Sequence, residues 1–103
     1  MGNLGYPFVP THPGEILKEE IEYRGISQKG LAKQMNLSYT MLNEILNAKR
    51  PVTASVALMF EASLGIKAEI LVNMQTRYNM QLARNDKKLL MRFEEIRKAC
   101  ACL

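Results

Sequence analysis

The stretch from Ser27 to Asn47 constrains the fold more than any other part of this 103-residue chain. It divides into two short segments, each opened by a serine, Ser27 and Ser38, whose hydroxyl can accept an amide hydrogen bond at a helix start. Apolar residues recur at helical spacing in both segments, and they are Leu31, Ala32, Met35, Leu42, Ile45 and Leu46. Asn36 lies between the segments and tolerates the left-handed conformation of a tight helix exit. The pattern predicts two packed helices with a sharp turn, the arrangement of a DNA-reading helix-turn-helix.

The alternative interpretation of this stretch is any pair of short packed helices. The short turn argues against it, and so does the exposed face of the second helix. That face carries Ser38, Tyr39, Thr40, Asn43, Glu44 and Asn47. A merely solvated face more often carries Lys and Glu than Ser, Thr, Asn and Tyr.

The remaining chain predicts four further helices, and no stretch alternates with the period of a strand. A first helix opens near Pro13 and Glu15 and ends at Gly25. Thr53 caps a fourth helix that Gly65 ends, a fifth runs over about residues 68–84, and a sixth over about 87–99. The predicted buried stripe of the first helix is Ile16, Leu17 and Ile21, and the core stripe of the fourth is Val56, Ala57, Phe60 and Leu64. The residues that recur at helical spacing in the fifth helix are Ile70, Leu71, Met74, Tyr78 and Leu82, and those that form an apolar stripe on the sixth are Leu89, Leu90, Phe93 and Ile96.

These elements predict three parts of the chain. Residues 1–10 hold two glycines and two prolines and read as a flexible arm, residues 11–84 as one helical domain, and residues 85–103 as a C-terminal helix and tail. The sixth helix exceeds what five short helices need to close a core. It therefore serves dimerisation or partner binding, or it docks on its own domain, and the sequence leaves both open.

The charge distribution favours a polyanionic partner for part of the chain. The formal net charge is +4. Residues 1–26 carry −2, whereas residues 27–50, with four basic groups and one acidic group, carry +3, and residues 51–103 carry another +3. The positive field therefore lies on the helix-turn-helix and the C-terminal half.

Few residues are suited to catalysis or metal binding. His12 is the only histidine and has no nearby Cys or Ser partner, so we interpret it as a cap or loop residue. Cys100 and Cys102 are too close to form a useful disulfide and too few for a zinc site, and they predict reduced thiols. No segment reaches the roughly 18–20 apolar residues of a membrane span. We expect neither an enzyme, nor a cofactor, nor a membrane protein, and we expect a cytoplasmic location.

From Thr11 to about residue 84 the chain resembles the HigA-type antitoxins, a bacterial branch of the Xre/Cro helix-turn-helix family related to phage lambda repressor. The matching stretches are His12–Leu17, Ile26–Gln28 with Leu31–Ala32, Leu42–Asn47 with Lys49–Thr53, Ala57–Leu58 through Leu64–Gly65, and Asn73–Gln75 with Tyr78. The resemblance implies a lambda-repressor-like domain of five helices, to which the sixth is an addition. It also implies an antitoxin that neutralises a HigB-type mRNA endonuclease and represses its own operon as a homodimer on a palindromic operator.

The second helix of the motif would then enter the major groove of double-stranded DNA. We expect Tyr39, Thr40 and Asn43 to contact bases, because Asn pairs with adenine and a Thr methyl meets that of thymine. Glu44 could accept from cytosine or point away from phosphates. The expected phosphate contacts are Gln28, Lys33, Ser38, Asn47, Lys49 and Arg50. One domain covers a half-site, so a dimer would span half-sites about 34 Å apart.

Two other functions remain open. The chain could be a stand-alone repressor without a toxin partner, or a protein-binding module whose helix-turn-helix no longer reads DNA. Loss of DNA binding on replacing Tyr39 and Asn43 would exclude the second, and a neighbouring toxin-like reading frame would exclude the first.

Overall fold

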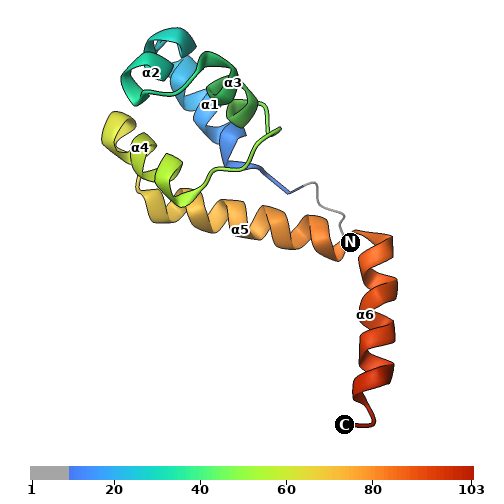
Figure 1. The fold of residues 1–103 in the computed structure, drawn as a ribbon. Coiled ribbons are helices and arrows are strands. Elements are labelled where there is room, and N and C mark those ends of the chain that lie inside the picture. Colours follow the sequence, from blue (N-terminus) through green and yellow to red (C-terminus); the bar gives the residue numbers. More distant parts are fainter. Residues whose placement is uncertain (1–9) are drawn as a thin grey trace. The chain divides into compact units, whose positions relative to one another are not determined.

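A computed structural model describes residues 10–103, which form six α-helices and no strand (Figure 1). The helices are α1 (Pro13–Tyr23), α2 (Gln28–Met35), α3 (Tyr39–Leu46), α4 (Ala54–Leu64), α5 (Ala68–Arg84) and α6 (Lys87–Cys100). The predicted all-α class and the additional C-terminal helix are confirmed. Of the predicted flexible arm, residues 1–9 lie outside the described part of the chain.

The contacts between residues divide the chain into two compact units. The first is Thr11–Thr76, and Arg77–Leu103 belongs to the second, so α5 contributes residues to both. The limits expected from the sequence, 11–84 and 85–103, stay predictions.

The core of the first unit is built around α3. This helix packs against both α1 and α2, and α2 also packs against α4. The largest fully buried apolar side chains are Leu17, Ile21, Leu42, Ile45, Leu46, Phe60 and Leu71. The apolar stripes predicted for α2, α3 and α4 are all buried, as expected.

The predicted buried stripe of α1 is wrong at Ile16, which is 43% exposed. In the apolar stripe of α5, Ile70 and Leu82 are also exposed, at 52% and 49%. In α1 the buried residues are Pro13, Gly14, Leu17 and Ile21, which fall within about 100° on the helical circumference, and Ile16 lies outside that arc. The first helix thus buries Pro13 and Gly14 in its first turn, whereas the isoleucine that the hydrophobic pattern predicts to be buried is exposed.

The first three helices end in the same way. After each, one residue takes a left-handed conformation, and these residues are Gly25 (φ 69°), Asn36 (φ 58°) and Ala48 (φ 62°). After α3, the Lys49 amide donates to the Glu44 carbonyl at 2.8 Å and the Ala48 amide to the Ile45 carbonyl at 3.2 Å, a Schellman motif. The predicted role of Asn36 is confirmed, whereas nothing in the residue type of Ala48 predicts its conformation.

The first turn of α1 lies directly against α3. A Cβ atom added to Gly14 would come within 1.9 Å of the Ile45 carbonyl oxygen, so only glycine permits this approach. His12 precedes that turn as the N-cap, as expected. Its Nδ1 accepts the Gly14 amide at 2.8 Å, and the Glu15 carboxylate accepts the His12 amide at 3.1 Å.

Two further hydrogen bonds connect distant segments of this unit. The amide of Val52, in the loop before α4, donates at 2.8 Å to the buried side chain of Gln75 on α5. Arg24, at the end of α1, donates at 2.9 Å to the Leu64 carbonyl at the end of α4. The first satisfies a backbone amide of the loop and the second a carbonyl at a helix end, so they stabilise the connections between helices as well as the core.

The α6 helix begins as predicted, with Asp86 accepting the amides of Lys88 and Leu89. None of its residues is buried, and Leu89, Leu90 and Ile96 are between 37% and 49% exposed. Cys100 ends the helix, Cys102 follows it, and both thiols are free and exposed. The roles considered for the apolar stripe of α6 stay predictions.

Candidate nucleic-acid interface

The outward face of α3 is polar from end to end. Leu42, Ile45 and Leu46 take the inward side, which leaves Thr40, Glu44 and Asn47 opposite them on the circumference, with Tyr39 and Asn43 at one edge. Tyr39 is 47% exposed, Thr40 and Asn47 are exposed, and Asn43 and Glu44 are half-buried. Ser38 caps the helix by accepting the Met41 amide at 3.0 Å. All of these side chains belong to the set predicted to meet DNA.

Asn43 is held by the first residue of α2. Its Nδ2 donates at 3.1 Å to Oε1 of Gln28, which is half-buried beside it. This contact uses one of the two N–H groups of the Asn43 amide and fixes which way the amide faces. The carbonyl oxygen and the second N–H remain, and these are the acceptor and donor that the edge of adenine requires.

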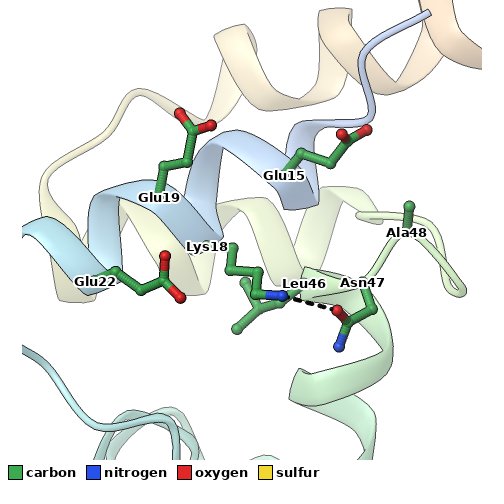
Figure 2. A pocket seen from close by; sticks show the side chains of 7 residues that line it. All are labelled: Glu15, Lys18, Glu19, Glu22, Leu46, Asn47 and Ala48. Atoms are coloured by element: carbon green, nitrogen blue, oxygen red, sulfur yellow. Dashed lines mark hydrogen bonds between the residues drawn. The ribbon is translucent and has the colours of Figure 1, made fainter. Parts of the chain in front are cut away.

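Asn47 continues the polar chain toward α1. Its Nδ2 donates to the Asn43 carbonyl at 2.8 Å, and its Oδ1 accepts from Lys18 Nζ at 3.1 Å. Figure 2 shows this contact at the edge of a hollow between α1 and the end of α3, which Glu15, Glu19 and Glu22 also line. Lys18 was not among the predicted site residues, since nothing in the sequence relates it to a residue 29 positions away.

The hollow in Figure 2 marks a limit of the interface. Three carboxylates on α1 face it and one lysine offsets them, so its field repels phosphate groups. A polyanion that approached α3 would therefore avoid the α1 side. This agrees with the negative charge predicted for the first 26 residues and the positive charge of residues 27–50.

Arg50 returns to α3 through the turn at Ala48. Its Nε and Nη2 donate to Glu44 Oε1 at 3.1 and 2.8 Å, although the two residues are six positions apart. Both side chains are partly exposed, 48% for Arg50 and 37% for Glu44. The structure therefore brings together two predicted site residues whose spacing along the chain does not predict a contact.

Lys33 on α2 and Lys49 after α3 are exposed. Among the described residues, neither lysine side chain forms a hydrogen bond or ion pair with the polar side chains of α3, so each is an independent positive charge. His12, the N-cap of α1, is a buried polar residue. Burial lowers the pKa of His12, an effect that Glu15 and a hydrogen bond with the Arg50 backbone oppose.

Other kinds of site have no support within residues 10–103. No group of three or more His, Cys, Asp or Glu side chains is arranged to hold a metal ion there. None of the helices described is long and apolar enough to cross a bilayer.

The fold and this surface define a helix-turn-helix protein of the Xre type. The profile of the family described as Helix-turn-helix matches residues 17–71, from the first helix to the fifth. The chain belongs to this family, among the HigA-type antidote proteins. The resemblance found in the sequence is thereby confirmed.

Three relatives carry the assignment. Virulence-associated protein I of Dichelobacter nodosus is 41% identical over 78 residues, which are 75% of this chain and 72% of that protein. The solved structure of an addiction module antidote protein of the HigA family from Coxiella burnetii is 34% identical with a TM-score of 0.73, and the match covers 85% of this chain and 95% of that one. The antitoxin HigA of Pseudomonas aeruginosa, solved with the higBA promoter, is 31% identical with a TM-score of 0.68 over 72% of this chain and 82% of that one.

Proposed function

We propose that this chain is the antitoxin of a type II toxin–antitoxin pair and represses its own operon by binding a palindromic operator as a dimer. The observation that carries the proposal is the polar face of α3, where Asn43 is oriented by Gln28. The similar antitoxin from Pseudomonas aeruginosa was solved with promoter DNA, which supports DNA as a partner of this chain.

In this proposal α3 lies in the major groove. Tyr39, Thr40 and Asn43 contact base edges, and the Gln28–Asn43 hydrogen bond presents the asparagine amide in the orientation that adenine pairs with. The phosphate contacts come from Gln28, Lys33, Ser38, Asn47, Lys49 and Arg50. Asn47 can contact a phosphate only if its hydrogen bond with Lys18 breaks or if Lys18 binds the same phosphate. We therefore expect its contribution to DNA affinity to be the smallest of these.

Fluorescence anisotropy tests the DNA-binding part. The native upstream duplex and a scrambled duplex of equal length are titrated at two salt concentrations. We expect the wild type to prefer the native duplex at both, because base contacts do not depend on counterion release whereas phosphate contacts do.

Two substitutions locate the contacts, and a third serves as the control. Tyr39→Ala and Asn43→Ala each remove a proposed base contact, worth about 1–3 kcal/mol. Each should weaken binding to the native duplex by roughly 5- to 150-fold and change the affinity for the scrambled duplex little. Tyr23→Ala removes a tyrosine that is 89% exposed at the end of α1 and should change neither. Equal binding of both duplexes by the wild type would refute sequence-specific repression.

The toxin partner requires a separate experiment. We propose that the partner is a HigB-type mRNA endonuclease encoded beside this gene. Expression of the neighbouring reading frame alone should arrest growth, and co-expression with this chain should restore it. If neither effect occurs while operator binding persists, the chain is a repressor that acts without a toxin.

A further inference from the structure

The ion pair between Glu44 and Arg50 lies on the surface that would meet DNA. Glu44 is on the outward side of α3 between Thr40 and Asn47, and Arg50 folds back to reach it. A carboxylate at this place would repel the phosphates of any duplex. Arg50 offsets that charge, but it is thereby held in one orientation.

The contact pattern shows how Arg50 is restrained. Two guanidinium nitrogens, Nε and Nη2, donate to the same carboxylate oxygen of Glu44. Nη1 is outside this ion pair and stays available for a phosphate oxygen. A guanidinium is planar and rigid, so fixing two of its nitrogens also fixes the direction in which the third points.

The chain turn before Arg50 supports a functional reason for the pair. Ala48 has a left-handed conformation, which is unfavourable for a residue with a Cβ atom. Strain of this kind is found where the surrounding structure requires it, often at functional sites. Here the turn reverses the chain and brings Arg50 beside Glu44.

We propose that Glu44 is a specificity-determining residue that acts by holding Arg50, so that Arg50 meets a phosphate only in the register set by the base contacts of α3. This inference rests on the proposed function. On the operator, α3 fixes the duplex and the held Nη1 meets its phosphate. On other sequences the protein samples many registers, and a restrained guanidinium cannot follow the phosphates. Glu44 thereby lowers affinity for non-operator DNA more than it lowers affinity for the operator.

Glu44→Gln tests the proposal because it keeps the shape and removes the charge. On the scrambled duplex we expect binding about fivefold tighter, with the slope of log K against log salt steeper by about 0.9, as for one additional phosphate contact. On the native duplex we expect a change below about twofold. Arg50→Lys should act in the same direction, because a single ammonium cannot keep the contact of two nitrogens.

The matched control is Glu20→Gln on α1. Glu20 also pairs with an arginine, Arg24 at 2.6 Å, and the substitution changes the net charge equally. It should leave both affinities unchanged. An equal gain in Glu20→Gln would mean that net charge alone acts, and would overturn the proposal.

The same substitution in a variant that lacks Arg50 distinguishes restraint of Arg50 from simple repulsion between Glu44 and the phosphates. In Arg50→Ala, adding Glu44→Gln should tighten binding to the scrambled duplex less than it does in the wild-type background, because only the repulsion by the carboxylate is relieved and there is no arginine to release. A gain as large as in the wild-type background would overturn the proposal, because Glu44 would then act only through its own charge. Loss of native binding alone would also overturn it, since Glu44 would then read cytosine directly.

These comparisons are distinct from the test of the proposed function. The wild type on native against scrambled DNA decides whether the chain is a sequence-specific repressor. The variants on the scrambled duplex decide what Glu44 does to Arg50. Either result can fail while the other stands.

Discussion

At Gly14 the first turn of α1 runs against the backbone of α3. A methyl group there would meet the Ile45 carbonyl oxygen and carbon, which belong to the helix backbone and cannot rotate away. The same turn holds the His12 cap and the buried ring of Pro13. Single atoms at these positions therefore decide how closely two helices approach.

Gly14→Ala should destabilise the fold by about 2–3 kcal/mol through overpacking. Urea denaturation followed by circular dichroism measures it. Gly25→Ala is the comparison, because Gly25 has open space around it and a φ of 69°, so its cost of about 1 kcal/mol is conformational only. A loss at Gly14 no larger than at Gly25 would mean that α1 and α3 separate easily.

His12 should make stability depend on pH. Burial lowers the pKa of His12 in the folded protein below its usual 6.5, so the unfolded chain binds the proton more readily. The stability that neutral His12 contributes is complete above pH 6.5, the pKa of the unfolded chain. It is lost as the pH falls from 6.5 toward the lower pKa of His12 in the folded protein. Protonation at Nδ1 also removes the acceptor for the Gly14 amide.

The measurement is the free energy of unfolding at pH 7.5 and pH 5.5. We expect the wild type to be less stable at the lower pH. His12→Asn keeps an N-cap acceptor but does not titrate in this range, so its stability should change less. Equal pH dependence in both proteins would show that other groups are responsible.

At the scale of the elements, the ends of α1, α2 and α3 are the informative features. Each uses a left-handed residue, and for two of them the residue type is the one expected there, Gly25 and Asn36. The third is Ala48, in the turn that leads to Arg50. Local residue preference accounts for two of these three helix ends, and for the end of α4 at Gly65 as predicted, whereas Ala48 takes its conformation against that preference.

Ala48→Gly should stabilise the fold by about 1 kcal/mol, because glycine adopts this conformation without the Cβ contact. Thermal unfolding measures the gain as a higher melting temperature. Asn36→Gly is the control and should gain less, since Asn already tolerates the left-handed region. A destabilised Ala48→Gly variant would show that the alanine side chain contributes contacts that outweigh the strain.

At the scale of the whole molecule, the proposed dimer must match the helical repeat of DNA. One helix-turn-helix domain contacts one half-site, and two-fold symmetry places the second about one turn away. Inserting five base pairs between the half-sites should therefore remove cooperative binding, because it rotates one half-site to the opposite side of the duplex. Electrophoretic mobility shift with the native and the extended operator measures this.

The control for the spacing experiment is the substitution of five central base pairs at constant length. This change keeps the half-sites one turn apart and should reduce affinity much less than the insertion. Equal affinity for the native and the extended operator would contradict binding as a two-fold symmetric dimer.

The sequence by itself determined the helices and most of their core. Period-3.6 spacing, capping residues Ser27, Ser38, Thr53 and Asp86, and the left-handed residue Asn36 are local signals, and local signals can be read from a chain. It also located the outward face of α3, since burial of Leu42, Ile45 and Leu46 leaves the polar residues on the other side. The family resemblance followed from the same stretches.

Only the tertiary structure decided which distant groups meet. The exposure of Ile16, the pairing of Gln28 with Asn43, the contact of Lys18 with Asn47 and the ion pair of Glu44 with Arg50 all depend on how helices and turns approach one another. Spacing along the chain carries no information about these contacts, because they join residues from different elements whose separation in space is set by packing. For the same reason the orientation of Asn43, on which the proposed reading of DNA depends, and the ion pair of Arg50 became visible only in the folded chain.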